Sequence, residues 1–491
     1  MKYILSIDQS TSGTKGLIFD ADGALLARAD LPHRQITNSA GWVEHDADEI
    51  LKNTLDVAAQ ALQKSGVDPA DVCAAGISNQ RETGVLWSKK SGAPLCNAIV
   101  WQCARAAGIA RQLEAEGAAA RIRAITGLTL SPYFTAPKLR WAVENIPAVR
   151  AALERDNLCA GTVDSFLVSH LTQEHAFKTD FSNASRTMLL DLDRGCWSGE
   201  LTALFGLRQS ALPELCASDD VFGHTTFGGL LPHPVPLCGV LGDSHGALFA
   251  NRCLAPGEAK VTYGTGSSIM MNAGPQRPKA VPGIVTSIAW KRQGQMVYAL
   301  EGNINYTGAV TKWLVEDLGL LAHSRDAGEI AAAVPSTEGV YLVPAFSGLG
   351  APYFDDDARA ILCGMNRTTR KAHVVRAAEE CIAYQIADVV AAMDGGGRHP
   401  ASLCADGGPT HDRFLMQFQA DILGIPLEIS RLEELSGAGA AYCAAIACGA
   451  SDEKRIFAHR EVQQIDPQMT REQREKLRRG WQQAVSLILK K

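Results

Sequence analysis

Two short stretches in opposite halves of this chain share one pattern, and they constrain its fold most strongly. Residues 3–23 and 259–274 each contain an apolar strand, a tight turn of glycine, serine and threonine, and a second apolar strand. Small residues at such a turn leave backbone N–H groups free to bind phosphate oxygens. In the first stretch Asp8 follows an apolar strand, where a carboxylate is costly to bury without a cation or a donor. The repeated loop predicts a nucleotide held between two related domains.

Length and composition indicate a soluble enzyme of two domains. A chain of 491 residues is too long for one compact core, and 46% hydrophobic with 20% charged residues is ordinary for a globular protein. A net charge of -6 gives no electrostatic basis for binding nucleic acid or an anionic membrane. The apolar stretches are too short to span a membrane, and the first strand begins too early for a signal peptide. Thirteen scattered cysteines without a CxxC pair predict reduced, mostly buried thiols and a cytoplasmic protein.

The order of predicted elements is similar in the two halves. In the first half we expect a meander with strands at 16–19 and 24–29, a helix at 47–65 after Asp46, and a strand at 72–77. Polar residues 78–82 follow that strand, where open α/β sheets bind ligands. In the second half we expect strands around 264–266, at 341–346 and at 402–405. We expect helices at 371–393 and 412–422, followed by a small-residue helix that begins at 437. A basic docking helix is expected at 470–491. We place the domain boundary near 250–257, which gives an N-terminal domain at 1–250 and a C-terminal domain at 251–491.

Seven segments in a fixed order carry a family resemblance. They are GWVEHD (41–46), SNQRET (78–83), AIVWQC (98–103), NASRTML (183–189), TYGTG (262–266), GLGAPY (348–353) and FLMQFQADILG (414–424). Together they resemble the FGGY carbohydrate kinase family, and within it the glycerol kinases, over nearly the whole chain. The resemblance implies an α/β fold of two actin-like, ribonuclease H-like domains with a nucleotide cleft between them. It also implies ATP-dependent phosphorylation of a terminal hydroxyl on a small polyol or ketose, with Mg²⁺.

The resemblance assigns the chemistry to two aspartates. Asp243, in the sequence LGDSH, matches the family's general base, which accepts the proton of the attacking hydroxyl. Asp8 matches the metal-side aspartate, and together with Asp243 it is expected to hold Mg²⁺ directly or through water. A helix N-cap carboxylate is the structural alternative for Asp243, and a turn-capping carboxylate is the alternative for Asp8.

The nucleotide site departs from the family pattern at a few positions. Lys15 keeps the charge that the family has there, but Ser10 replaces a usual glycine, Lys312 a neutral polar residue and Asp412 an asparagine near the adenine. Lys15 and Lys312 have solvated surface charges as their alternative interpretation. The resemblance places Thr11, Ser12, Gly13 and Lys15 on the phosphates, Thr265 and Gly266 at the γ-phosphate, and Gly308, Lys312, Gly408 and Asp412 around the rest of the nucleotide.

The acceptor site is expected to contain a charged pair and two aromatic residues. Arg81 and Glu82 match the pair that hydrogen-bonds polyol hydroxyls, because one side chain donates and the other accepts. Trp101 matches the aromatic residue that packs on the polyol carbons, and Tyr133 matches a hydroxyl partner. A surface ion pair is the alternative for the charged residues, and core packing is the alternative for Trp101.

Two small residues interrupt the resemblance at the acceptor site. Ser244 follows the catalytic aspartate where glycerol kinases have glutamine, and Ser268 stands where they have an aromatic residue. Lost side-chain volume must be filled by substrate, water or a neighbour, so we expect a pocket longer and more polar than glycerol needs. Erythritol, erythrulose or a pentulose would fit such a pocket. His245 is either a new hydroxyl ligand or a histidine that packs its helix.

Two alternative functions remain open from the sequence. A pentulose kinase of the same family is disfavoured by Asn79-Gln80-Arg81-Glu82, because xylulose kinases usually carry a Gln-Met-His-Gly-type motif there. A non-catalytic actin-like ATP-binding regulator would share the phosphate loops but would have no reason to keep the acceptor residues. The expected partner is a small polyol or ketose. Homodimers or homotetramers are common among the proteins that this chain resembles.

Overall fold

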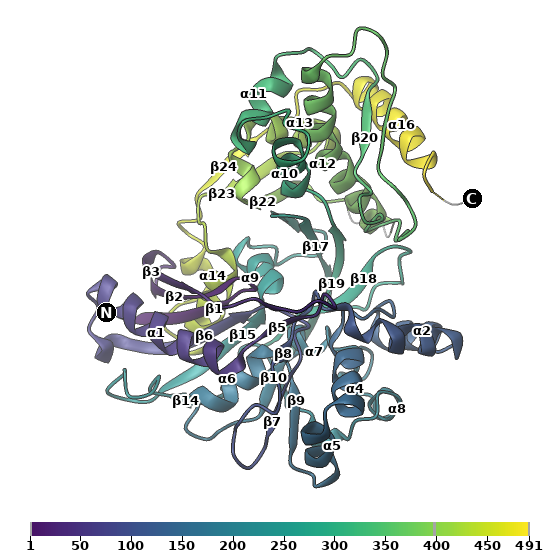
Figure 1. Ribbon diagram of the computed structural model, residues 1–491. Helices are drawn as coiled ribbons and strands as arrows, with labels where there is room; N and C mark the ends of the chain where they lie inside the picture. The colour runs from purple at the N-terminus through teal and green to yellow at the C-terminus, as the bar shows by residue number, and fades with distance from the viewer. Residues whose placement is uncertain (1, 396–398, 490–491) are drawn as a thin grey trace.

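The structure, a computed structural model, describes residues 2–395 and 399–489. The chain forms two lobes, each built on one large sheet with helices packed against it (Figure 1). In the first sheet β1, β2 and β3 form an antiparallel meander, while β6 and β15 continue the sheet in parallel with β1. The strands, in sheet order, are β14 (Gly223–Thr225), β15 (Val235–Gly242), β6 (Val72–Asn79), β1 (Tyr3–Gln9), β2 (Gly13–Asp20) and β3 (Leu25–Pro32).

The second sheet repeats this arrangement. Its strands β16, β17 and β19 are antiparallel neighbours, and β22 and β23 continue the sheet in parallel with β16. The duplication predicted from the paired loops is therefore present in the strand order of both lobes. The strands, in sheet order, are β18 (Val285–Arg292), β19 (Gln295–Ile304), β17 (Ser267–Gly274), β16 (Ala259–Tyr263), β22 (Leu403–Gly407), β23 (Leu427–Ser430) and β24 (Val462–Ile465).

Strand β1 is buried on both faces because a helix covers each side. Successive side chains of a strand point to opposite faces, so Leu5 and Ile7 join the core under α1 (Ala47–Ser65), whereas Ile4 joins the core under α14 (Leu435–Ala447). Asp46 caps α1 as predicted, because its side chain accepts from the N–H groups of Asp48 and Glu49.

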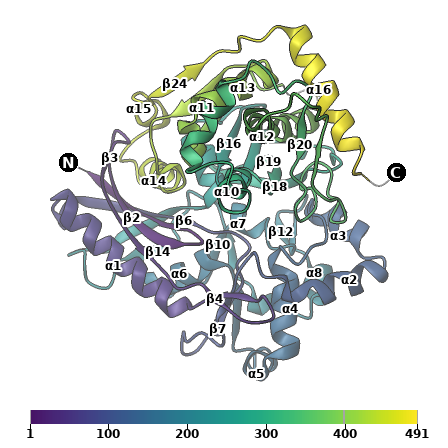
Figure 2. The same cartoon turned by 45° about the horizontal axis from the view of Figure 1, so that its top comes forward.

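Helix α14 comes late in the chain but packs on the first sheet (Figures 1 and 2). Glycine at 437 permits this approach, because a Cβ there would lie 2.3 Å from Leu17 Cδ1 of β2. Glycine at 439 lets α14 pack on α9 (Asp243–Ala250), because a Cβ there would lie 2.0 Å from the Gly246 carbonyl oxygen. The C-terminal segment therefore contributes to both lobes. The domain division at residue 250 stays a prediction.

The segment between β6 and β15 forms the lower part of the first lobe in Figure 1, and its helix α7 (Phe181–Ala184) also packs on β18 of the second sheet. Of the residues expected at the acceptor, it carries Arg81, Glu82, Trp101 and Tyr133. Its other main elements are β7 (Val85–Ser88) paired with β9 (Leu158–Gly161), and the helices α2 (Ala107–Ala115), α3 (Ala119–Thr126), α4 (Thr135–Asn145), α5 (Pro147–Glu154), α6 (Val163–Leu171) and α8 (Gly199–Leu204).

Helices cover the second sheet, and the predicted docking helix is among them. Helix α16 (Arg471–Ser486) buries Trp481, whose ring stacks on Tyr384 with centroids 5.3 Å apart and whose Nε1 donates to Asp388 at 2.6 Å. This helix therefore packs against the rest of the chain, while residues 490–491 of the predicted docking helix lie outside the described part. The other helices of this lobe include α10 (Gly308–Glu316), α11 (Ala327–Ala332), α12 (Lys371–Asp394) and α13 (Arg413–Leu423).

One predicted strand is shorter than expected. The segment 341–346 forms only β20 (Tyr341–Val343), which within the described residues pairs with β21 (Ile361–Cys363) and stays outside the large sheet. Pro344 follows and cannot donate to a strand ladder, so the pairing ends there.

The cysteines match their prediction, because all thirteen thiols are free and eight are buried. No helix within 2–395 and 399–489 is long and apolar enough to cross a membrane.

Candidate active site

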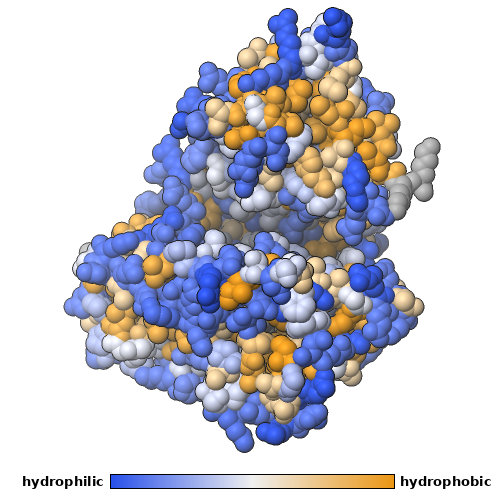
Figure 3. All heavy atoms as spheres, viewed as in Figure 1, coloured by the Kyte–Doolittle hydropathy of each residue, from blue (hydrophilic) through white to orange (hydrophobic). Residues whose placement is uncertain are grey.

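The site lies where three parallel strands of the first sheet end, next to the groove between the lobes (Figure 3). Asp8 pairs in register with Ser78, which pairs with Leu241, so the ends of β1, β6 and β15 meet at one edge. Asp243 is the first residue of α9, directly after β15, and its side chain is 34% exposed. Because the Asp243 side chain is partly exposed, its carboxylate is open to a ligand in the groove.

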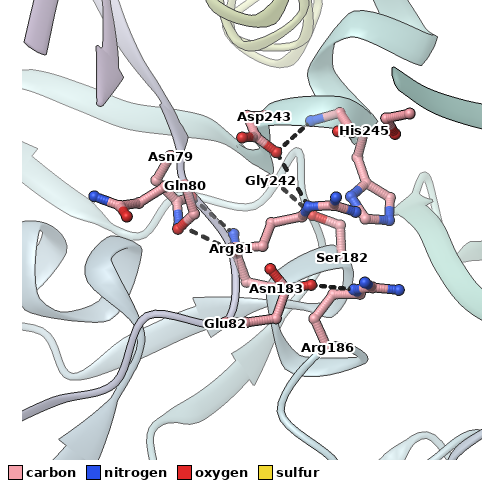
Figure 4. A network of polar contacts seen from close by, with 12 residues as sticks. Asn79, Gln80, Arg81, Glu82, Ser182, Asn183, Arg186, Gly242, Asp243 and His245 are labelled. Carbon is pink, nitrogen blue, oxygen red and sulfur yellow. Dashed lines mark hydrogen bonds and ion pairs between the residues drawn. The ribbon is translucent and has the colours of Figure 1, made fainter. Parts of the chain in front are cut away.

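Asp243 is held by two donors. Its Oδ1 accepts from the Ser244 N–H at 2.6 Å and lies 3.1 Å from Arg81 Nε (Figure 4). Asp243 is thus the first residue of the helix, whereas Gly242 occupies the N-cap position, so the N-cap alternative does not describe Asp243. This placement is compatible with a general base, because the side chain remains partly open.

Asp8 is buried beside a lysine and a glutamate. The Lys15 Nζ lies 3.6 Å from Asp8 Oδ2 and 2.6 Å from Glu434 Oε2, just before α14. Asp8 Oδ1 is buried and has no hydrogen-bond partner in the described part of the chain. The pKa of Asp8 is raised to about 6, because burial and the negative charges of Glu434 and Asp243 outweigh the opposing effect of Lys15. This electrostatic pattern favours a cation beside Asp8.

A buried ion-pair network connects the acceptor residues to the second lobe. Arg81 donates through both Nη atoms to Glu301, with each bond 2.9 Å long. Glu301 Oε2 also lies 3.0 Å from Arg186 Nη1, and Arg186 Nε donates to Glu82 (Figure 4 shows Arg186 and Glu82). Burial raises the pKa of Glu301, but Arg186 and Arg81 outweigh that effect and hold this pKa well below its usual range.

The sequence analysis missed Glu301, Arg186 and Glu434. Arg186 lies inside the quoted NASRTML segment, and Glu301 interrupts the apolar strand of residues 297–300. A charge inside an apolar strand needs a buried partner, which is the signal that could have identified Glu301.

The two aromatic acceptor candidates lie together. The rings of Trp101 and Tyr133 meet edge to face with centroids 5.5 Å apart, and Trp101 Nε1 donates to Thr11 Oγ1 at 2.9 Å. Lys138, fully buried in α4, donates to the carbonyls of Tyr133 and Phe134 and so fixes the Tyr133 backbone. Of the two aromatic residues, Trp101 thereby contacts the first phosphate loop through Thr11.

Ser244 and Ser268 face each other across the lobes. Their Oγ atoms lie 3.5 Å apart, and both residues are half-buried next to Asp243. His245 is fully buried, with Nε2 3.3 Å from Ser287 Oγ, and burial together with the Arg81 charge lowers its pKa well below the usual range. This burial favours the packing alternative for His245.

A cavity of about 840 Å³ contains part of the expected nucleotide site. Gly308, Gly408 and Asp412 line it, as does the buried Glu379 of α12. Lys312 does not line this cavity, because its side chain is 66% exposed and its Nζ lies 3.5 Å from Glu316 Oε2. The surface-charge alternative describes the position of Lys312 better.

The second phosphate loop is bonded to the start of α10. The carbonyl of Thr265 accepts from the Thr307 N–H at 2.9 Å, and that of Gly264 accepts from the Gly308 N–H at 3.0 Å. A Cβ at Gly266 would lie 2.3 Å from the Ile304 carbonyl oxygen, so only glycine fits this turn.

The first phosphate loop joins β1 and β2. The Ser12 carbonyl accepts from the His33 N–H at 3.3 Å, and Gly13 begins β2. The roles of these positions in ligand binding stay predictions.

Two family models cover most of the chain. The model described as "FGGY family of carbohydrate kinases, N-terminal domain" matches residues 3–250, and the corresponding C-terminal domain model matches residues 259–448. The chain belongs to the FGGY family of carbohydrate kinases. This carbohydrate kinase is 44% identical to glycerol kinase 1 of Thermotoga maritima, with 99% of each chain covered. It is 42% identical to the glycerol kinase of Carboxydothermus hydrogenoformans, over 99% of this chain and 98% of that one.

Solved structures agree with this assignment. A structure of Plasmodium falciparum glycerol kinase with ADP covers 100% of this kinase and 99% of its own chain, with a TM-score of 0.94 and 32% identity. The xylulose kinase of Lactobacillus acidophilus has a TM-score of 0.89 at 21% identity, covering 99% of this chain and 98% of its own, and supports the fold alone. The two-domain α/β fold and the transfer of a phosphoryl group to an alcohol are thus established for this kinase.

Proposed function

We propose that this kinase transfers the γ-phosphoryl group of Mg-ATP to a terminal hydroxyl of glycerol, with Asp243 as the general base. One observation carries the proposal: Asp243 is partly open at the edge of the first sheet, beside Arg81 Nε at 3.1 Å and facing the lobe that carries the second phosphate loop. The glycerol kinases that match over 99% of the chain support glycerol as the acceptor. The proton of the attacking hydroxyl would pass to an Asp243 carboxylate oxygen.

Magnesium fits the residues around Asp8. A hard cation takes oxygen ligands, and Mg²⁺ is usually held by one or two carboxylates together with substrate phosphates. The unpartnered Asp8 Oδ1 supplies such an oxygen, and Asp243 is the second carboxylate. Within the described residues no three His, Cys, Asp or Glu side chains gather as a metal cage, and a phosphate-bound ion does not need one. When bound, the ion would neutralise charge on the phosphates.

The remaining roles follow the positions of the side chains. Lys15 would contact the phosphates from the first loop, while the backbone of Thr265 and Gly266 would do so from the second. Gly308, Gly408 and Asp412 line the cavity that would hold the rest of the nucleotide.

On the acceptor side, Trp101 and Tyr133 would pack against the polyol, and Ser244 and Ser268 would leave room for a fourth carbon. Arg81 and Glu82 would bind the hydroxyls.

The test is ADP release measured with C3 to C6 polyols and ketoses, including xylulose and ribulose. We expect turnover with glycerol and with four-carbon polyols. Asp243→Asn should lower kcat by about 100-fold or more while ATP binding changes little, because it removes the base and keeps the shape. Asp452→Asn is the matched control, since Asp452 caps the remote helix α15 (Glu453–Ile456). The kinase proposal fails if no acceptor raises ADP release above the water background.

A further inference from the structure

Glu301 is the member of the buried ion-pair network that comes from the second lobe. It lies on β19, whereas Arg81, Glu82, Arg186 and Asp243 all belong to the first lobe. We infer that Glu301 is a positioning residue that orients the acceptor-binding side chains and couples acceptor binding to nucleotide binding. This inference rests on the proposed function, because it concerns the acceptor of that reaction.

Glu301 determines the direction of the Arg81 guanidinium. The side chain of Glu301 is 0% exposed and binds both Nη atoms of Arg81 at 2.9 Å. A bidentate carboxylate fixes the plane of a guanidinium, because the fork has only one matching orientation. In that orientation Nε of Arg81 points at Asp243 Oδ1, 3.1 Å away. Loss of the Glu301 charge would free Arg81 to turn.

The same carboxylate also supports Glu82. Glu301 Oε2 lies 3.0 Å from Arg186 Nη1, and Arg186 Nε donates to Glu82. Glu82 has a φ of 60°, a left-handed conformation that a residue with a side chain rarely adopts. Such a conformation persists when surrounding contacts hold it. Glu301 therefore acts on both charged acceptor residues.

Strand β19 connects Glu301 to the second phosphate loop. Three residues after Glu301, the Ile304 carbonyl lies against Gly266, and the Thr307 N–H donates to the Thr265 carbonyl. A phosphate that orders this loop would therefore also order the end of β19. Two ligands that order one element bind cooperatively, and the coupling is reciprocal.

The network contains three carboxylates and two guanidinium groups. Each guanidinium contacts two of the carboxylates, and Glu301 is the carboxylate that both contact. Glu301→Gln keeps the size of the side chain but removes the charge that both arginines share. The variant should loosen Arg81 and Arg186 while leaving the cavity around Gly308, Gly408 and Asp412 intact.

The experiment measures glycerol affinity by calorimetry on the full chain, with and without Mg²⁺ and a non-hydrolysable ATP analogue. In the wild type we expect the analogue to tighten glycerol binding at least about fivefold. In Glu301→Gln we expect glycerol binding to weaken about tenfold and the coupling to fall below about twofold, with analogue affinity changed less than about twofold. Asp388→Asn is the matched control, since it neutralises another buried carboxylate of the second lobe, bound to Trp481 and Tyr353. It should keep the wild-type coupling.

Several results would overturn the inference. The first is a Glu301→Gln variant in which the analogue tightens glycerol binding as much as in the wild type. The second is a Glu301→Gln variant that loses glycerol affinity and analogue affinity equally. The third is a wild type that binds both ligands but in which neither ligand affects the other. If the variant does not fold, the coupling is tested by hydrogen exchange of the wild type. The analogue alone should slow exchange at residues 78–83 and 183–188. Unchanged exchange at these residues refutes the coupling. A wild type that binds no acceptor and has no turnover would refute the proposed function instead.

Discussion

The glutamate buried beside the nucleotide cavity gives a prediction with a calculable size. Glu379 is 2% exposed on α12, and its Oε1 accepts from Thr311 Oγ1 at 3.3 Å. Burial, with a further contribution from the Asp412 charge, raises its pKa from 4.5 to about 8. Because the pKa is raised in the folded state, folding takes up a proton between these values. The stability contributed by the protonated side chain is complete below pH 4.5 and is lost as the pH rises through 8.

Glu379→Gln removes this dependence, because glutamine stays neutral at every pH. One pKa unit corresponds to about 1.4 kcal/mol, so the substitution should raise the free energy of unfolding by about 4 kcal/mol at pH 7.5 and about 2 kcal/mol at pH 6. The assay is urea unfolding of the nucleotide-free protein at both pH values, followed by tryptophan fluorescence. Glu114→Gln on the exposed face of α2 is the control, and it should not change the free energy of unfolding at either pH.

The same group should affect ATP. Ionised Glu379 beside Asp412 repels the polyphosphate, so the KM for ATP of the wild type should rise above pH 8, whereas that of Glu379→Gln should not. The reasoning is refuted if the substitution stabilises the protein equally at pH 6 and pH 7.5, or if it destabilises the protein at pH 7.5.

Two further substitutions test the packing of the site. Ser268→Phe should fill the space beside Ser244. In the ADP-release assay, kcat/KM should therefore fall for four-carbon polyols and stay the same or rise for glycerol. An equal fall of kcat/KM for both acceptors would contradict the prediction of a larger pocket. Gly439→Ala should destabilise the protein by about 1–3 kcal/mol in urea unfolding, because its Cβ meets the Gly246 carbonyl oxygen. Gly108→Ala in α2, where a Cβ meets nothing within 4 Å, should instead be neutral or stabilising; destabilisation by both would point to a general effect of the change.

Local patterns in the sequence predicted the elements that local residues determine. The Asp46 cap and the apolar spacing defined α1, and the glycine-rich turns defined both hairpins. The strand predicted at 341–346 is shorter than expected because Pro344 ends its pairing, and the proline is visible in the sequence. Lys312 was placed by resemblance alone; it is not among the residues that line the cavity, and its Nζ lies 3.5 Å from Glu316 Oε2. The match to a family motif therefore predicts where the backbone of a residue lies more reliably than where its long, charged side chain lies.

Two of the residues that the sequence did not reveal are glutamates whose partners lie far away in the chain. Glu434 reaches Lys15 from the start of α14, more than 400 positions later in the chain, and Glu301 reaches Arg81 from β19. No local pattern predicts such a pair, because its two members are far apart in the sequence and only the tertiary packing brings them together. Both glutamates lie buried against a cation of the first lobe, one beside the first phosphate loop and one beside the acceptor residues. The duplicated hairpins thus predict where a nucleotide lies, and the proposed link between its site and the acceptor runs through Glu301 of the second lobe. Variants of Glu301 and of Glu434 should therefore differ, with the first affecting acceptor binding and the second affecting the phosphate side.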